Sequence, residues 1–269
     1  KQARQRFYKK VILIGIPSLG LLAFLIITFF LNDLYMSNKI NPQINLVMGT
    51  SFYKKTSSNI WQRATVGIKV KKGFAFKTEN NAFMDILLQN GTAVRITENS
   101  HLELSDSNLK KISFSLKNGS LYGKFKKLRR SQKLLIKTKT TVASIRGTQL
   151  GIITQPQMAK TGTYCLKGVI DYYNKKSSSN KVTLKKHEKS TISQFEAPTK
   201  PAKMTPFEIA TMQKIIDSIK LNRTLFVTSK ITFAPGSFTI NETSKTALNT
   251  IFKVLGKTDK GVIQIAGHT

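Results

Sequence analysis

Short apolar segments recur through the middle of the chain, separated by polar turns. Between residues 61 and 194, stretches such as VGIKV, FAFKT, MDILL, HLELS and KLLIKT follow one another at intervals of roughly ten residues. Within ISFSL, Ile112, Phe114 and Leu116 fall on one side of an extended chain and two serines on the other. This pattern predicts an all-β domain, built as a sandwich, a barrel or a short solenoid.

Two Asn-Gly pairs lie between predicted strands of the β region. Asn90-Gly91 lies between MDILLQ and TAVRIT, and Asn118-Gly119 lies between ISFSLK and SLYGKF. Both residue types tolerate positive φ, and Asn-Gly between alternating apolar residues is a strong signal for a tight hairpin. The sequence therefore predicts a hairpin at each pair.

A helix is predicted after the β region. The stretch FEAPTKPAKMTP combines prolines and lysines, which predicts a stiff polar linker outside any core. Thr205 can cap a helix, Pro206 fits its first position, and Glu208 completes a capping box. An apolar stripe at helical spacing follows, made of Ile209, Met212, Ile216 and Ile219.

The last forty residues alternate strand, helix and strand. KITFA (230–234) and VIQIAG (262–267) are apolar, and a helix is expected between them from about Glu242, with Gly256 at its C-cap. One βαβ unit cannot bury both faces of its strands, so we expect this domain to continue. The apolar face of the helix carries Leu248, Ile251, Phe252 and Leu255.

An uncharged apolar run of 21 residues, 11–31, lies near the start of the chain. At ~1.5 Å per residue it is about as long as a bilayer is thick. Residues 1–10 carry five positive charges and no acid, whereas Asp33 and Lys39 roughly cancel after the run. No small-x-small cleavage site follows it. We expect an uncleaved single-pass inner-membrane anchor, with a cytoplasmic N-terminus and the bulk of the chain in the periplasm.

The net charge of +31 indicates which classes of partner the chain favours. Lysines far outnumber arginines, and lysine acts as a point charge where arginine makes bidentate contacts. Such a chain favours anionic surfaces, although lysine-rich composition that merely fills solvated faces is the competing interpretation. In the periplasm this charge meets envelope polymers, so no nucleic-acid partner is expected. The basic stretch 124–133 includes Phe125, which we expect to face the core.

No pattern in the sequence points to an enzyme. His101, His187 and His268 are far apart, and none forms a metal-ligand spacing with cysteine or acids. There is neither a nucleophile elbow nor a phosphate-binding glycine loop. Cys165 is the only cysteine, so it has no disulfide partner, and we expect a small buried side chain. A non-enzymatic protein without metal or cofactor is predicted.

Three motifs in order resemble the FecR family of envelope proteins: VGIKVKKGFAFKT, QNGTAVRITENSHLEL and TTVASIRGTQLGI. The resemblance covers roughly residues 66–194, and Ile145 and Leu150 replace the usual Val and Phe conservatively. Gly147 would permit a bulge or a close approach. Arg146 would hydrogen-bond neighbouring carbonyls, or alternatively bind an anion. The resemblance implies a structural motif set made of Asn90, Gly91, Arg95, Arg146, Gly147 and Thr148.

The FecR resemblance also implies a mode of action. Members of this family are sensors that relay a receptor signal across the inner membrane, with a cytoplasmic anti-sigma segment, one span and a periplasmic FecR domain. The ten residues before the apolar run are too few for a folded anti-sigma domain. We therefore expect signalling only if more chain precedes Lys1.

Residues 230–269 are similar to the start of an OmpA-like peptidoglycan-binding domain. Phe233, Ser237 and Leu255 match, and the segment ends in Gly267-His268-Thr269. In that family an aspartate follows Gly-His-Thr and an arginine lies further on, and both grip the peptide stem. Both positions lie beyond Thr269. The resemblance implies a peptidoglycan partner, with Gly267, His268 and Thr269 in the binding loop.

Together these features predict a non-enzymatic, inner-membrane-anchored periplasmic protein. Its FecR domain would bind an unidentified periplasmic protein and its OmpA-like end would hold peptidoglycan; the alternative is a FecR-type transducer that regulates a sigma factor. The expected fold is one membrane helix, an all-β FecR-like domain and a partial α/β unit. The expected parts are a basic tail (1–10), an anchor (11–31), a juxtamembrane linker (32–60), the FecR-like β-domain (61–194), a Pro/Lys linker with a helix (195–229) and an incomplete OmpA-like domain (230–269).

Overall fold

The computed structural model describes residue 28 and residues 42–89, 92–108, 110–126, 132–194, 196–222 and 239–255. The chain divides into two compact units, Lys1–Arg223 and Thr224–Thr269. No helix within these described ranges is both long and apolar enough to cross a bilayer. The expected anchor, residues 11–31, lies outside them except for Thr28.

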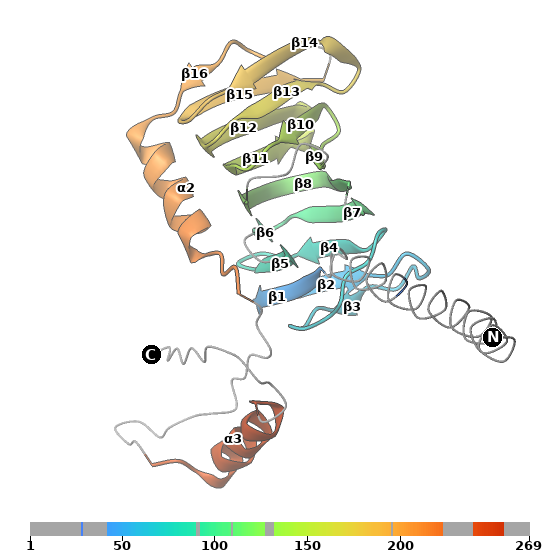
Figure 1. Ribbon diagram of the computed structural model, residues 1–269, viewed down its shortest axis with the longest axis vertical. Helices are drawn as coiled ribbons and strands as arrows, with labels where there is room; N and C mark the ends of the chain where they lie inside the picture. The colour runs from blue at the N-terminus through green and yellow to red at the C-terminus, as the bar shows by residue number, and fades with distance from the viewer. Residues whose placement is uncertain are drawn as a thin grey trace, which may run out of the picture. The chain divides into compact units, whose positions relative to one another are not determined.

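The first unit is built from two β-sheets whose strands are stacked one above another (Figure 1). All neighbouring strands are antiparallel, except that β8 and β9 are parallel. The first sheet runs in the order β1 (Gln43–Met48), β5 (Phe83–Gln89), β6 (Thr92–Ile96), β8 (Lys111–Phe125), β11 (Gln149–Gln155), β12 (Lys160–Lys167), β15 (Glu188–Ser193) and β16 (Ala202–Lys203). The second runs in the order β3 (Gln62–Arg63), β2 (Ser51–Lys54), β4 (Ala75–Thr78), β7 (His101–Ser107), β8, β9 (Lys133–Lys137), β10 (Thr141–Ile145), β13 (Ile170–Asn174) and β14 (Ser177–Leu184).

Strand β8 belongs to both sheets, which corrects one predicted hairpin. Its first half pairs with β7 and β9, and its second half pairs with β6 and β11. The change of sheet falls at Gly119, whose φ is +86° and where a Cβ atom would lie 2.5 Å from the Cα of Ser100. Asn118-Gly119 therefore forms a corner within one strand, because positive φ serves a corner as well as a hairpin.

The other predicted hairpin is confirmed by its strands. Gln89 of β5 is paired with Thr92 of β6, which leaves two residues for the turn. Those residues, Asn90 and Gly91, lie outside the described ranges.

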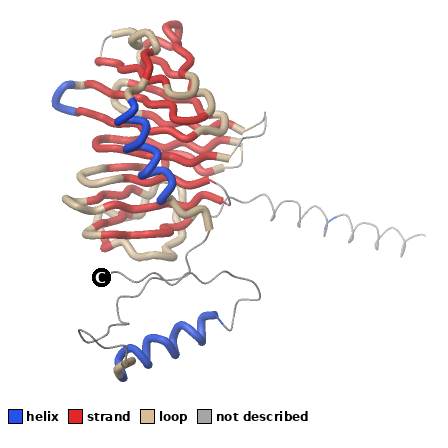
Figure 2. The backbone as a smooth tube through the Cα atoms, turned by 90° about the vertical axis from the view of Figure 1, so that its left-hand side faces the viewer, coloured by secondary structure: helices blue, strands red, loops and turns tan. Residues whose placement is uncertain are grey.

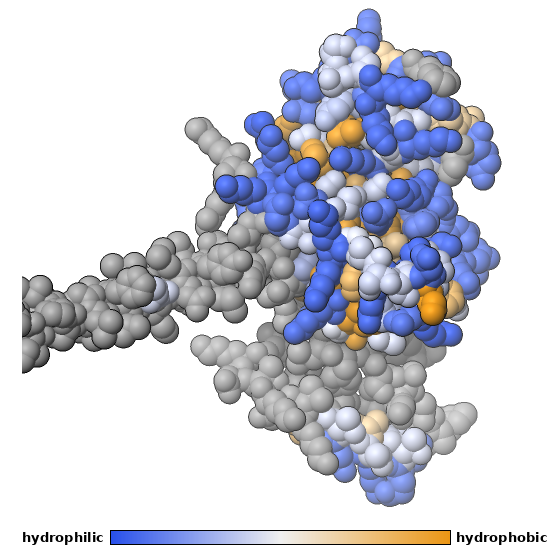
Figure 3. All heavy atoms as spheres, turned by 90° about the vertical axis from the view of Figure 1, so that its right-hand side faces the viewer, coloured by the Kyte–Doolittle hydropathy of each residue, from blue (hydrophilic) through white to orange (hydrophobic). Residues whose placement is uncertain are grey.

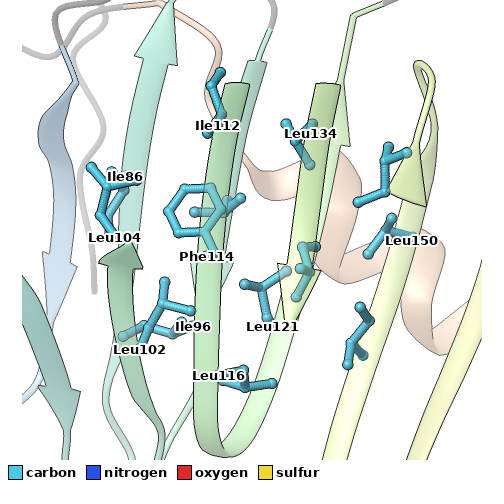
Figure 4. Packing of buried hydrophobic residues seen from close by; sticks show 14 of the residues in the cluster. Ile86, Ile96, Leu102, Leu104, Ile112, Phe114, Leu116, Leu121, Leu134 and Leu150 are labelled. Carbon is cyan, nitrogen blue, oxygen red and sulfur yellow. The ribbon is translucent and has the colours of Figure 1, made fainter. Parts of the chain in front are cut away.

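The main core lies between the two sheets and explains the period-two pattern of the sequence. Ile112, Phe114 and Leu116 of β8 all point inward and are at most 5 % exposed. Figure 4 shows them packed among the aliphatic side chains of the neighbouring strands. Phe125 is buried as predicted. The all-β prediction is thus confirmed, and of the three architectures left open by the sequence the domain has that of a two-sheet sandwich.

The β-domain is longer at both ends than the sequence indicated. Strands β1 and β2 lie inside the expected linker 32–60, and Ile44 and Tyr53 contribute to the core. At the other end, β16 pairs with β15 and Met204 is buried, although this proline-rich stretch was expected to stay outside any core. The period-two pattern is weak at both ends: a register shift between Ile44 and Leu46 interrupts it in β1, and β2 and β16 have only four and two residues.

Helix α2 (Pro206–Ser218) follows β16 and confirms the predicted helix start. Thr205 caps the helix, Pro206 begins it, and Glu208 completes the capping box. Figure 2 shows α2 lying across the strands of the first sheet. Among the described residues there is also a short 3-10 helix, Pro156–Met158, between β11 and β12.

The second unit contains helix α3 (Glu242–Leu255) in its described part. These bounds agree with the helix predicted from about Glu242. The predicted strands 230–234 and 262–267 lie outside the described residues, as does the Gly267-His268-Thr269 loop. The OmpA-like unit therefore stays a prediction.

Candidate functional site

Arg95, one of the predicted motif residues, forms a buried ion pair on the outer side of the first sheet. Arg95 of β6 lies directly opposite Asp85 of β5. Its Nε donates to Asp85 Oδ1 at 2.6 Å and its Nη2 to Oδ2 at 2.7 Å, a bidentate arrangement. The guanidinium carbon also lies 4.2 Å from the ring centre of Phe83. Asp85 is fully buried and Arg95 is 5 % exposed, so the pair is shielded from water.

The burial of Asp85 disfavours the charged form of its carboxyl group. Burial raises the pKa of this carboxyl above its usual range, while the hydrogen bonds and the charge of Arg95 act in the other direction. The charged form of Asp85 is therefore stabilised mainly by Arg95, which offsets the cost of burying the carboxylate. Removing either member would leave an isolated buried charge.

Arg95 also fastens the end of helix α2. Its Nη1 donates to Ser218 Oγ at 2.5 Å, and Nη2 donates to the Ser218 carbonyl at 3.4 Å. Just beyond, the Asn45 amide of β1 donates to the carbonyl of Asn222 at 2.9 Å. These contacts bring the chain that leaves α2 back to β1, the first strand of the domain.

A second apolar cluster lies between α2 and the first sheet. The Lys189 ammonium of β15 contacts the Glu208 carboxylate at 2.6 Å, beside the start of the helix. Met212, Ile216 and Ile219 are at most 5 % exposed. The helix thus covers outward-pointing apolar residues of the strands, namely Leu87, Ala93, Tyr122 and Leu166.

The Arg146-Gly147-Thr148 segment is a corner at which the chain passes from β10 in one sheet to β11 in the other. Gly147 has φ of +92°, and the Thr148 carbonyl accepts a hydrogen bond from the Phe125 amide at 2.9 Å. A Cβ atom on Gly168, in the next corner, would lie 2.6 Å from the Gly147 carbonyl. The glycines therefore let two successive corners stack closely, as the sequence suggested for Gly147.

The Arg146 side chain is exposed at this corner. It makes no hydrogen bond or ion pair with any residue that the structure describes, so the expected bonds to neighbouring carbonyls are absent. The two motif arginines thus differ: Arg95 is buried and paired, and Arg146 projects into solvent. The structure brings Arg95 together with Asp85 and Ser218, and leaves Arg146 apart.

The outer face of the second sheet carries no covering helix among the described elements. Figure 3 looks onto the side opposite α2, where hydrophilic side chains predominate. We call this surface the open face. Its outward-pointing residues are exposed or half-buried and include Lys54, Lys77, His101, Glu103, Lys117, Lys137, Asp171, Tyr173 and Lys181.

Trp61, the only tryptophan, forms an aromatic cluster at one end of the open face. The Lys77 ammonium lies 4.5 Å from its ring centre and the Lys54 ammonium 5.3 Å away. The His101 ring packs edge-on at 5.6 Å. Partial burial lowers the pKa of His101, and Lys77 and its neighbours lower it further, so the local potential is positive.

The remaining titratable groups fit a structural role. Cys165 is fully buried, as predicted, and burial raises the pKa of its thiol to about 12, so it is held as the neutral thiol at neutral pH. His187 occupies a turn with φ of +60°. Across the described ranges, no group of three or more His, Cys, Asp or Glu side chains could hold a metal ion.

The contacts of Asp85 and of Trp61 were not predicted from the sequence, although each residue stands out in it. Asp85 is the one acid in its apolar strand, which marks it as a candidate partner for a basic residue, although the predicted hairpin alone would place Ile86 opposite Arg95. Trp61 is the only tryptophan of the chain and lies in a stretch whose only charged residues are basic. Ser218, by contrast, has no local signal, because its partner Arg95 lies 123 residues away.

Comparison with known proteins supports part of the resemblance. Residues 75–171 match the FecR protein family model. No curated protein matches the chain. Two crystal structures, each described as a "putative anti-sigma factor" from Parabacteroides distasonis ATCC 8503, are similar at 8 % and 9 % identity. The similarity covers 68 % and 72 % of this chain and 92 % and 91 % of those chains, with TM-scores of 0.42 and 0.35.

The matched region begins at Ala75, the first residue of β4, and ends at Asp171 in β13. It therefore includes the Asp85–Arg95 pair, the β8 crossing and the Arg146-Gly147-Thr148 corner. The OmpA-like segment lies outside it. The chain therefore contains a FecR domain, at residues 75–171.

Proposed function

We propose that the chain is a non-enzymatic FecR-type signal transducer that regulates a sigma factor through protein–protein contact. The observation that carries the proposal is the FecR match across the middle of the β-domain. The resemblance described above implies that FecR proteins relay a receptor signal. In this proposal the sandwich is a rigid recognition module on the periplasmic side, where its partner is a receptor protein, and the sigma factor is contacted from the cytoplasmic side.

The geometry supports a module of this kind. Helix α2 and the Asp85–Arg95 pair fix the first sheet, which leaves the open face of the second sheet for a partner. The topology proposed with it is the one expected from sequence: a membrane anchor at 11–31, with the β-domain in the periplasm.

The proposal is tested by pairing the intact gene product with each sigma factor of its genome in a bacterial two-hybrid assay. One sigma factor should give a signal well above the others. The receptor side is tested separately: Lys137→Glu on the open face should weaken the response of the sigma factor's target genes while leaving the two-hybrid signal intact, and Lys214→Glu on the exposed side of α2 is its control. No signal with any sigma factor would contradict the proposal.

Peptidoglycan tethering, the first expectation from sequence, has no support from the comparisons. It makes a separate prediction, namely that the intact protein sediments with purified cell-wall sacculi. Sedimentation together with a negative two-hybrid result would favour the tether over the transducer.

A further inference from the structure

The end of the β-domain formed by β1–β4 is strongly basic. No aspartate or glutamate occurs between Asp33 and Glu79. All but one of the basic residues of 43–78 are exposed, the exception being the half-buried Lys54, and none forms an ion pair with a described residue. We call them the basic pole: Lys54, Lys55, Arg63, Lys69, Lys71, Lys72 and Lys77.

Two loops of the basic pole are held against each other. The Thr56 hydroxyl donates to the Lys72 carbonyl at 2.8 Å, and the Gly73 amide donates to the Leu104 carbonyl at 2.7 Å. A Cβ atom on Gly73, whose φ is +83°, would lie 2.3 Å from Thr56 Oγ1. Lysines from both loops therefore belong to one surface with fixed backbone, although they are distant in sequence.

Apolar side chains lie within this positive surface. Ile60 is 71 % exposed, and the half-buried Trp61 follows it. An exposed aliphatic residue beside a tryptophan, surrounded by lysines, is typical of a surface that rests in the interface of a bilayer. Tryptophan suits this place because its ring is apolar and its N–H is polar.

The chain itself indicates which anionic surface is near. Eleven residues, 32–42, separate the uncharged apolar run 11–31 from β1. Fully extended they reach about 40 Å at most. If the apolar run lies in a bilayer, the basic pole is thus confined close to lipid headgroups.

We propose that the basic pole docks on an anionic lipid bilayer, with its lysines at the headgroups and Ile60 and Trp61 in the interface. Clustered lysines bind anionic lipid by charge attraction, which salt weakens. The docked surface orients the β-domain and leaves the rest of the open face, from β9 to β14, free of the membrane. This inference rests on the membrane anchor of the proposed function, and it does not depend on a sigma factor.

The test uses the fluorescence of Trp61, the sole tryptophan of the full chain, excited at the red edge of its absorption where the tyrosines absorb little. The protein is reconstituted into vesicles of phosphatidylcholine alone or mixed with phosphatidylglycerol, each with lipids brominated on their acyl chains. Quenching should be about twofold or more stronger in the anionic vesicles, and high salt should reduce the difference. Equal quenching in the two lipid compositions would overturn the proposal.

A matched pair of double variants tests whether the lysines of the basic pole are the ones that bind the anionic lipid. Lys71→Gln/Lys72→Gln removes two charges from the basic pole without touching Trp61. Lys139→Gln/Lys175→Gln removes two exposed charges near the β9–β10 and β13–β14 turns. The first should lose about half or more of the anionic-lipid quenching, and the second should keep it. Equal loss in both would mean that net charge acts without a docking surface, and would contradict the proposal.

Discussion

The two outer faces of the sandwich both arise from the alternation of inward and outward residues along the strands. Only one of them is covered by a described helix. On the first sheet the outward positions are apolar, such as Leu87 and Leu166, and α2 covers them. On the second sheet they are lysines and other polar residues, and no described helix covers them. The outward residues thus decide which face becomes a second core and which stays open to partners.

This difference also separates the two kinds of charge in the molecule. Arg95 is buried with its own carboxylate and fastens α2. The lysines of the open face and the basic pole are surface charges, worth little for stability and available for anions. If the comparison is right, mutations on the covered face should act on stability, and mutations on the open face should not.

The largest effect is expected from Arg95→Ala. The fully buried Asp85 would lose its partner, which should lower the free energy of unfolding by about 3–5 kcal/mol. Chemical denaturation of the full chain measures this. The double variant Asp85→Leu/Arg95→Met should recover most of the loss, because it leaves no unpaired charge. A double variant as unstable as the single one would show that packing, not charge, dominates.

The same variant has a predictable pH dependence. The folded-state pKa of Asp85 is already raised, so ionising it opposes folding; the stability linked to this group is complete below its ordinary pKa and falls as the pH rises through the folded pKa. Without Arg95 that pKa rises further. The destabilisation of Arg95→Ala should therefore be largest at neutral pH and shrink as the pH falls. A pH-independent deficit would contradict this.

The next effect is expected from Ile216→Ala at the centre of the covered face. Its side chain is fully buried between α2 and the first sheet, so truncation should lower the free energy of unfolding by about 2–4 kcal/mol. The control is Phe207→Ala on the same helix, because Phe207 is 80 % exposed. Equal effects of the two variants would show that α2 is not packed as described.

A smaller effect is expected at the start of α2. Thr205→Ala removes the cap that accepts from the Glu208 amide, and should lower the free energy of unfolding by about 1 kcal/mol. Thermal denaturation followed by circular dichroism measures it. Thr205→Ser keeps the hydroxyl and should retain most of the stability; a loss as large as that of Thr205→Ala would argue against the cap.

The smallest effect is expected on the open face. Lys137→Gln should change the free energy of unfolding by less than about 0.5 kcal/mol, because its side chain is on the outer surface and has no ion pair with a described residue. Urea denaturation beside the Ile216→Ala variant checks this. A loss above about 1 kcal/mol would remove the distinction between the two faces.

Much of this architecture could be predicted from local patterns. The inward row of β8, the capping box at Thr205 and the hairpin between β5 and β6 all follow from neighbouring residues. The corner at Gly119 could not be told from a hairpin, since both need positive φ. The alternation in β1 is interrupted by a register shift, so this strand could not be distinguished from a linker.

The Asp85–Arg95 pair shows why a site is harder to predict than its strands. A regular two-residue turn at 90–91 would place Arg95 opposite Ile86. A register shift between Leu87 and Gln89 brings it opposite Asp85 instead. One bulged residue thus decides whether Arg95 lies opposite Asp85. The contact with Ser218 depends on the tertiary packing of α2 and has no local pattern at all.

The proposed function of this FecR-domain protein is to control transcription through a sigma factor. The most direct measurement is the transcript profile of a strain that lacks the gene, compared with the same strain carrying the intact gene again. The account predicts that one set of genes sharing a promoter sequence changes in the deletion strain and returns to its original level on complementation. An unchanged profile, in cells grown where the protein is made, would contradict it.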